Sequence, residues 1–179
     1  GNHITSDIAH GLRLPIDAAE EIKKQYGYAL EREVADNETF SVRTFSDEKP
    51  VLVSRKELAL IIEARVEEVF ELVLQEIKRS GYDGLLPAGM VLTGGTSNLP
   101  GIRQLASNVL GLPVRIAQPE GLTGLTDQLG SPAYSTSVGL LYWALLMSEA
   151  VPAPQGGSPL KGVSFNWDAI RNFLKRLLP

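Results

Sequence analysis

A strand–helix–strand pattern between residues 89 and 117 constrains the fold of this chain more than any other feature. The apolar run 89–93 predicts a short buried strand, residues 100–110 predict a helix that Gly111 closes, and residues 114–117 predict a second strand. A strand, a helix and a strand in this order form a βαβ unit, whose two strands run parallel. We therefore expect an α/β architecture.

A long amphipathic helix is predicted from about Arg55 to Ser80. Ser54 and Glu57 have the spacing of a capping box at its start. Six apolar residues recur at helical spacing and form one stripe, which is expected to face the core. They are Leu58, Ile62, Val66, Val69, Val73 and Ile77. A helix of about 26 residues is roughly 40 Å long, and such a helix usually backs a sheet or bridges two subdomains.

The other segments have weaker patterns. Two helices, divided at Gly11 and with Pro15 in the first position of the second, are predicted to end at Gly27. Short alternating segments within residues 28–53 predict a small antiparallel meander. The apolar stretch 138–147 is too short to span a bilayer, which takes about 20 residues, so it predicts a helix buried in the core.

The composition suits a globular chain and excludes several kinds of chemistry. Of 179 residues, 44% are hydrophobic, none is cysteine and two are histidine, which excludes disulfides, thiolate catalysis and cysteine-containing zinc sites. The net charge of −4 argues against nucleic acid as a partner. This charge is unevenly placed. Residues 1–160 carry 13 Lys and Arg against 20 Asp and Glu, a net −7, whereas residues 161–179 carry four cations and one anion, a net +3.

The basic end of the chain has the pattern of a membrane-binding helix. Residues 151–164 are rich in Pro and Gly and predict a linker, and residues 165–179 predict an amphipathic helix with bulky apolar residues and basic neighbours. The residues expected at the membrane are Trp167, Ile170, Arg171, Phe173, Leu174, Lys175, Arg176 and Leu177. Each cation near anionic lipid adds roughly 1 kcal/mol. The alternative, a helix docked on the acidic body of its own chain, stays open.

A glycine loop, Thr93–Asn98, follows the first strand of the predicted βαβ unit. It lies at the carboxyl end of a strand, where open α/β sheets bind ligands, and glycines let a ligand approach the backbone closely. Two glycines are equally consistent with a simple turn. Asp127, Ser135 and Thr136 are not interpreted as catalytic, because no histidine is near them in sequence and hydroxyls at a helix start usually cap it.

Five blocks of sequence, taken in order, resemble the FtsA family of actin-like bacterial cell-division proteins. The blocks are Gly1–Ala9, Ala19–Gly27, Val91–Thr96, Gly121–Asp127 and Tyr134–Leu141, and the resemblance covers about residues 1–147. It implies the second lobe of an actin-like (RNase H-like) α/β fold. The implied parts are an incomplete nucleotide-binding subdomain (residues 1–27 and 81–150), an inserted small α/β subdomain that binds FtsZ (28–80), a linker (151–164) and a C-terminal amphipathic membrane helix (165–179).

The resemblance also implies a site for ATP. Gly94, Gly95 and Thr96 would line the adenosine side, and Glu20 and Lys23 would reach the adenine or ribose from a helix opposite. Because Glu20 and Lys23 are three residues apart, they share a helix face, although a solvated surface ion pair has the same spacing.

The phosphate side of this implied site has no counterpart in the sequence. The two Gly-rich phosphate loops of the family are not found, so we expect this chain to be a C-terminal piece of a larger protein that binds ATP with Mg²⁺. The piece itself is expected to bind nucleotide weakly or not at all. The intact protein is expected to have at most weak ATPase activity, so we do not classify it as an enzyme.

The implied partners are FtsZ, the membrane and further copies of the protein. Arg65, Glu68 and Leu72 match the family's site for the C-terminal peptide of FtsZ, although a solvated, charge-rich helix face has the same composition. The intact protein is expected to self-associate into filaments. It would hold FtsZ at the cytoplasmic face of the bacterial inner membrane, at the division septum.

Two other functions are consistent with an actin-like fold. One is the scaffold of another system, such as PilM of type IV pili, but the basic amphipathic C-terminal segment weighs against it. The other is a fragment of a sugar-kinase-superfamily enzyme, which would need a catalytic Asp and a sugar pocket that these residues do not supply.

Overall fold

A computed structural model describes residues 1–43, 50–124 and 129–150, with side chains described as far as residue 147. The chain divides into two units, Gly1–Leu141 and Tyr142–Pro179. The predicted linker and membrane helix, residues 151–179, lie outside the described residues. The cavity and the helix face described below belong to the first unit.

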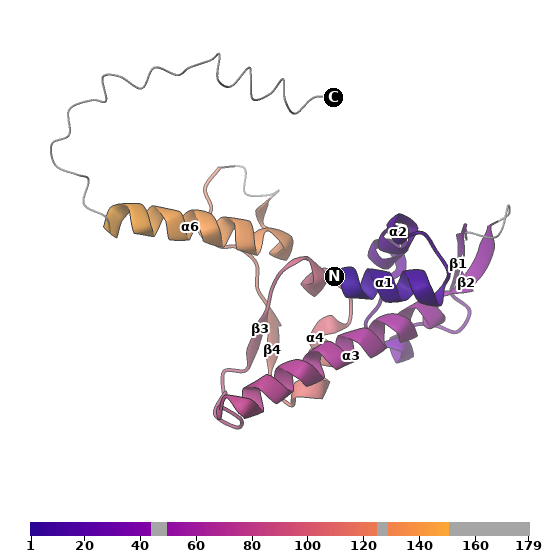
Figure 1. The fold of residues 1–179 in the computed structure, drawn as a ribbon, viewed down its shortest axis with the longest axis horizontal. Coiled ribbons are helices and arrows are strands. Elements are labelled where there is room, and N and C mark those ends of the chain that lie inside the picture. Colours follow the sequence, from indigo (N-terminus) through magenta and orange to yellow (C-terminus); the bar gives the residue numbers. More distant parts are fainter. Residues whose placement is uncertain (44–49, 125–128, 151–179) are drawn as a thin grey trace, which may run out of the picture. The chain divides into compact units, whose positions relative to one another are not determined.

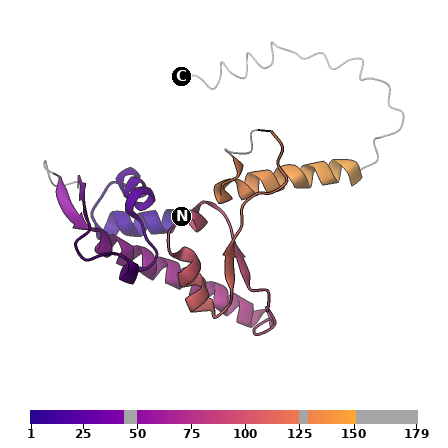
Figure 2. The same ribbon diagram turned by 180° about the vertical axis from the view of Figure 1, so that it is seen from behind.

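The first unit is assembled on the long helix that the sequence predicts. Its helices are α1 (Asn2–Gly11), α2 (Ile16–Tyr26), α3 (Arg55–Arg79) and α4 (Ile102–Leu110). Helices α1 and α4 pack against α3, and α2 packs mainly against α1 (Figure 1). Figure 2 shows the same packing from the opposite side. Leu58 and Ile62 of α3 are fully buried in one continuous core with Ile8 of α1. The division of residues 28–80 from the rest as an inserted subdomain stays a prediction.

Two details of α3 differ from the expectation. Val69 is 45% exposed, and Phe70 is buried in its place, four residues after the buried Val66 and on the same face of the helix. The capping box does not form, since the side chain of Ser54 makes no capping hydrogen bond. The backbone N–H of Arg55, the first of the helix, donates to the carbonyl of Glu38, at 2.9 Å.

The start of α2 also differs slightly. Pro15 stands just before the helix rather than in its first position, and Gly27 follows its last residue, as expected. A short antiparallel hairpin comes next, formed by β1 (Thr39–Val42) and β2 (Val51–Ser54), which confirms the predicted strands. Phe40 of β1 is buried and stacks on Tyr26, with ring centroids 4.6 Å apart, so the hairpin is joined to the end of α2.

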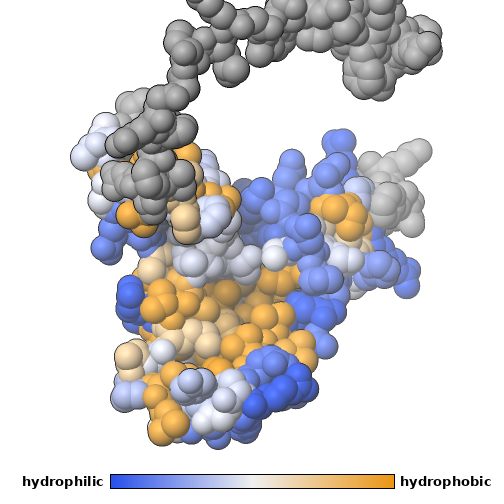
Figure 3. Space-filling model, turned by 60° about the vertical axis from the view of Figure 1, so that its left-hand side comes forward, coloured by the Kyte–Doolittle hydropathy of each residue, from blue (hydrophilic) through white to orange (hydrophobic). Residues whose placement is uncertain are grey.

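The predicted βαβ unit is confirmed. Strands β3 (Met90–Leu92) and β4 (Val114–Ile116) are parallel neighbours, and α4 between them ends at Gly111, which has the left-handed backbone of a helix C-cap. The prediction that β3 is buried was wrong, because Val91 is 49% exposed. Parallel strands are normally covered on both faces, and here one face is open. Figure 3, in which the left-hand side of Figure 1 is turned forward, shows apolar side chains gathered on that side.

The apolar helix α6 (Ser135–Ala150) is not the buried core helix that the sequence predicts. Val138 is buried, but Leu140, Leu141, Trp143 and Leu146 are each at least 59% exposed. A helix that is apolar all round is normally buried on every side, but among the side chains of α6 that the structure describes only Val138 is buried, so the other sides lack a covering element. No helix within the described ranges is both long and apolar enough to cross a bilayer.

Candidate functional site

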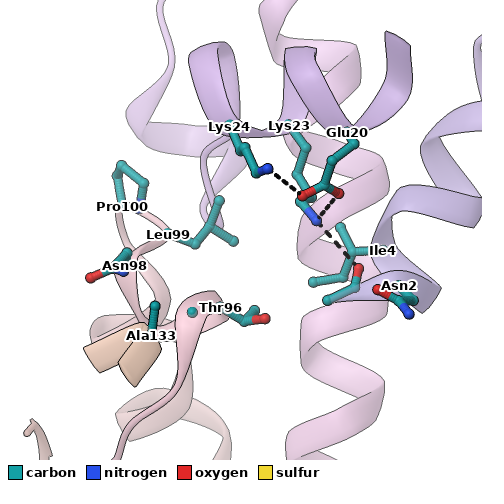
Figure 4. Close-up of a pocket in the computed structure, with 12 residues that line it drawn as sticks. Asn2, Ile4, Glu20, Lys23, Lys24, Thr96, Asn98, Leu99, Pro100 and Ala133 are labelled. Carbon is teal, nitrogen blue, oxygen red and sulfur yellow. Dashed lines mark hydrogen bonds and ion pairs between the residues drawn. The ribbon is translucent and has the colours of Figure 1, made fainter. Parts of the chain in front are cut away.

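A cavity of about 500 Å³ lies in the first unit, between the helices at its start and the loop after β3. Its lining comes from α1, α2, the glycine loop and the turn before α6. The lining residues are Gly1, Asn2, Ile4, Glu20, Lys23, Lys24, Gly95, Thr96, Asn98, Leu99, Pro100 and Ala133. Figure 4 shows charged side chains on the α2 side and mostly small or apolar residues opposite. The cavity therefore brings together residues from two distant parts of the sequence.

Glu20 and Lys23 form the charged wall of this cavity. Their side chains make an ion pair on one face of α2, as their spacing predicts, and Lys24 lies 3.2 Å from the other oxygen of Glu20. The side chain of Lys23 is only 14% exposed. The pair is therefore not the solvated surface pair that the sequence left open.

Helix α1 supports this pair from behind. The Nζ of Lys23 donates to the hydroxyl of Thr5 at 2.8 Å, and that hydroxyl lies 2.5 Å from a carboxylate oxygen of Glu20. Burial raises the pKa of the Glu20 carboxyl, but hydrogen bonds from Lys23, Thr5 and Lys24 outweigh burial and lower the pKa to about 2. Glu20 is thus a carboxylate, and a strong hydrogen-bond acceptor, over the whole physiological pH range.

The glycine loop forms the opposite wall. Gly95 and Thr96 line the cavity, whereas Gly94 lies just before them at the end of β3. Gly94 has φ +90°, a backbone conformation that residues with a Cβ rarely adopt. The Ser97 hydroxyl donates to the Gly94 carbonyl at 2.7 Å and so closes the loop on itself. Four of the five predicted nucleotide-site residues therefore line one cavity, and the fifth shapes its wall.

The predicted partner-binding residues lie on α3. Arg65 donates to both carboxylate oxygens of Asp7 on α1, at 2.5 and 2.9 Å, and also pairs with Glu68 one turn along its own helix. The hydrogen bonds from Arg65 lower the pKa of Asp7 more than burial raises it. Leu72, the next residue on the same face, is 55% exposed. This surface offers an apolar side chain beside a fixed guanidinium.

Three residues that hydrogen-bond to the predicted site residues were not found from the sequence: Thr5, Ser97 and Asp7. Thr5 had a signal, since it shares a helix face with the apolar Ile4 and Ile8, where a hydroxyl is unusual. Asp7 had none, because its partner Arg65 is 58 residues away. Within the described residues, no group of three or more His, Cys, Asp or Glu is placed to hold a metal ion.

Comparisons with known proteins agree on one family. The family model described as "Cell division protein FtsA" matches residues 1–139. Curated proteins with that name are 46% identical over 145 residues in Pseudomonas aeruginosa, 42% over 159 in Neisseria meningitidis and 42% over 144 in Bacillus subtilis. These alignments cover 81%, 88% and 80% of this chain but 35%, 38% and 31% of the relatives, so the chain spans about a third of their length.

Two solved structures share the fold. They are MreB5 of Spiroplasma citri bound to ADP, with a TM-score of 0.61, and the same protein bound to AMPPNP, with a TM-score of 0.55. Each is 16% identical to this chain. The matches cover 83% and 84% of this chain and 45% and 46% of the solved chains. At this identity, the likeness shows the fold alone.

Proposed function

The chain belongs to the FtsA family of cell-division proteins, which has an actin-like fold, and we propose that it supplies the adenosine side of an ATP site and a face that binds FtsZ. One observation carries the first part: the Glu20–Lys23 pair and the glycine loop meet around a single cavity. The nucleotides in the two MreB5 structures support the same ligand class.

The chemistry of the cavity suits a nucleoside. The Glu20 carboxylate can accept hydrogen bonds from ribose hydroxyls, the Lys23 ammonium can donate to ring or ribose acceptors, and Gly95 leaves room for the ligand beside the backbone. ATP with Mg²⁺ is proposed for the intact protein only, and any hydrolysis there is slow and incidental.

Titration of ADP into the isotope-labelled chain, followed by NMR, tests the nucleotide site at the weak affinity we expect. The amide signals of Gly95, Thr96 and Lys24 should shift with one dissociation constant. Glu20→Gln should weaken that constant about tenfold, because a charged hydrogen-bond acceptor is lost. Arg79→Ala, on an exposed turn of α3, is the matched control and should leave it unchanged. Shifts confined to other residues would contradict the proposal.

The FtsZ-binding face is proposed at Arg65, Glu68 and Leu72. Support comes from the exposed Leu72 next to a guanidinium whose position is fixed, an arrangement that suits a peptide with one apolar anchor and an acidic group. Charge reversal at Arg65 and Glu68 should weaken binding of the FtsZ C-terminal peptide, and so should Leu72→Ala. In a fluorescence-anisotropy titration, each change should raise the dissociation constant of the peptide about tenfold. Glu76→Lys, one turn further along α3, is the control, and equal affinities for all variants would move the site elsewhere.

A membrane tether is proposed for the basic C-terminal segment, residues 165–179, on its sequence pattern. With it, the intact protein would attach FtsZ filaments to the cytoplasmic face of the inner membrane at the septum, and would itself form filaments. Co-sedimentation with anionic vesicles compares the whole chain with one that ends at Gly157. The whole chain should sediment with the vesicles and the shortened one should stay in solution, whereas equal sedimentation would remove the tether.

A further inference from the structure

Two buried hydroxyls lie behind the two walls of the cavity. Among the residues that the structure describes, the buried polar residues are Thr5 and Ser97, with 4% and 3% of their surface exposed. Neither lines the cavity. Burying a hydroxyl is costly unless it is hydrogen-bonded, so the partners of each are informative.

The hydroxyl of Thr5 joins both members of the charged pair. It accepts from Lys23 at 2.8 Å, and it lies 2.5 Å from Glu20 and 3.1 Å from the carbonyl of Gly1. A hydroxyl has one proton, so it donates to Glu20 or to Gly1 but not to both. The closer carboxylate is charged and is the stronger acceptor. Thr5 therefore fixes where the carboxylate and the ammonium stand relative to each other.

The hydroxyl of Ser97 does the equivalent for the glycine loop. It donates to the carbonyl of Gly94, and the backbone N–H of Ser97 donates to the same carbonyl at 3.1 Å. The backbone N–H of Gly94 donates in turn to the carbonyl of Pro132. These bonds hold Gly94 in its positive-φ conformation and so set the direction in which Gly95 and Thr96 follow the strand.

We propose that Thr5 and Ser97 are positioning residues of the nucleotide pocket, each holding one wall in the geometry that the nucleoside needs. The inference rests on the proposed nucleotide site and adds two residues that do not touch the ligand. An apolar side chain at either position would fill the core equally well, but it could not bind the groups that form the walls.

The experiment compares Thr5→Val, which keeps the shape, with Thr5→Ser, which keeps the hydroxyl. One readout is the pKa of the Glu20 carboxyl, followed by carbon NMR, and the other is the ADP titration described above. Thr5→Val should raise the Glu20 pKa from about 2 toward 4.5 and weaken ADP binding about tenfold, and Thr5→Ser should restore both. In a Glu20→Gln background, Thr5→Val should weaken ADP binding little further, because Thr5 acts through that carboxylate.

Ser97→Ala tests the other wall of the cavity and serves as a control for the Thr5 variants. It should weaken ADP binding several-fold and shift the amide signals of Gly95 and Thr96, while the Glu20 pKa stays where it is. If Thr5→Val does not fold, Thr5→Ala removes the same hydroxyl without adding a methyl group.

Three results would overturn the inference. They are an unchanged Glu20 pKa in Thr5→Val, unchanged ADP affinity in both hydroxyl-free variants, and failure of Thr5→Ser to restore binding. Failure of the proposed function looks different. The wild-type chain would then show no ADP-dependent shifts, while the Glu20 pKa would still show whether Thr5 positions the pair.

Discussion

Two charged pairs of this chain have the same spacing but lie in different surroundings. Glu20 and Lys23 on α2 have side chains that are 33% and 14% exposed, and a buried hydroxyl links them at the edge of a cavity. Arg65 and Glu68 on α3 are 33% and 53% exposed, and a carboxylate from another helix holds only the arginine. The spacing gives both pairs a shared helix face. Both pairs are supported by α1, but it contacts both members of the first pair and only the arginine of the second.

A third pair completes the series. Glu76 and Arg79 near the end of α3 have the same spacing, and their side chains are 67% and 77% exposed. Among the described residues, their side chains make one polar contact, the ion pair with each other. The three pairs therefore form a graded set in which sequence spacing is constant and the surroundings change.

The largest effect is expected from Lys23→Met, which breaks the most buried pair. Breaking a fully buried pair costs about 3–5 kcal/mol. Glu20 keeps Lys24, Thr5 and some water, so we expect a loss of about 2 kcal/mol in the free energy of unfolding. Urea unfolding followed by circular dichroism measures it. A loss below about 0.5 kcal/mol would place this pair with ordinary surface pairs.

Acid should separate the first pair from the others. The pKa of Glu20 is lower in the folded chain, about 2, than its ordinary 4.5, so its charge stabilises the fold fully above pH 4.5. That stabilisation is lost as the pH falls toward 2. On going from pH 7 to pH 3, the midpoint of thermal unfolding should fall by about 4 °C more in the wild type than in Glu20→Gln. Parallel curves for the two proteins would show that Glu20 titrates normally.

Asp7→Asn should have a smaller effect, because Asp7 and Arg65 are both partly in water. The substitution removes the charge but keeps the shape, and we expect a loss of about 1 kcal/mol or less in unfolding free energy. Glu68→Gln, which removes the more exposed partner of Arg65, is the matched comparison and should cost less. The order of the two in urea unfolding tests whether the bond between helices matters more than the bond within one.

The smallest effect is expected from Arg79→Ala. Both members of its pair are exposed, and pairs of this kind contribute less than about 0.5 kcal/mol. Screening of this pair by high salt should change the unfolding free energy of the wild-type chain as little as the substitution does. A larger loss would mean that spacing alone stabilises such pairs and that the comparison above is mistaken.

Much of the fold follows from local pattern. The long helix was predicted to within a residue at its end, and the parallel strands on either side of α4 were predicted from their order. The meeting of Glu20 and Lys23 with the glycine loop was predicted from family resemblance, not from periodicity. The family match favours this interpretation over a pilus scaffold or a sugar kinase.

Long-range and context-dependent features were missed for physical reasons. The bond between Asp7 and Arg65 joins residues 58 apart, and a single sequence carries no trace of such a pair. The exposure of Val91 and of most of α6 depends on which other elements cover them, so an apolar run alone cannot decide it. The capping box did not form although Ser54 and Glu57 have its spacing, because spacing alone does not orient the Ser54 side chain toward the helix amides.

Helix α1 is only ten residues long, yet it serves both regions compared above. Thr5 and Asp7 are two residues apart, about 3 Å along the axis, and they point to nearly opposite sides. One reaches the Glu20–Lys23 pair and the other reaches Arg65. A tilt of this short helix would change both contacts. We therefore expect substitutions at these two positions to covary among relatives, because a change at one would alter the helix position on which the other depends.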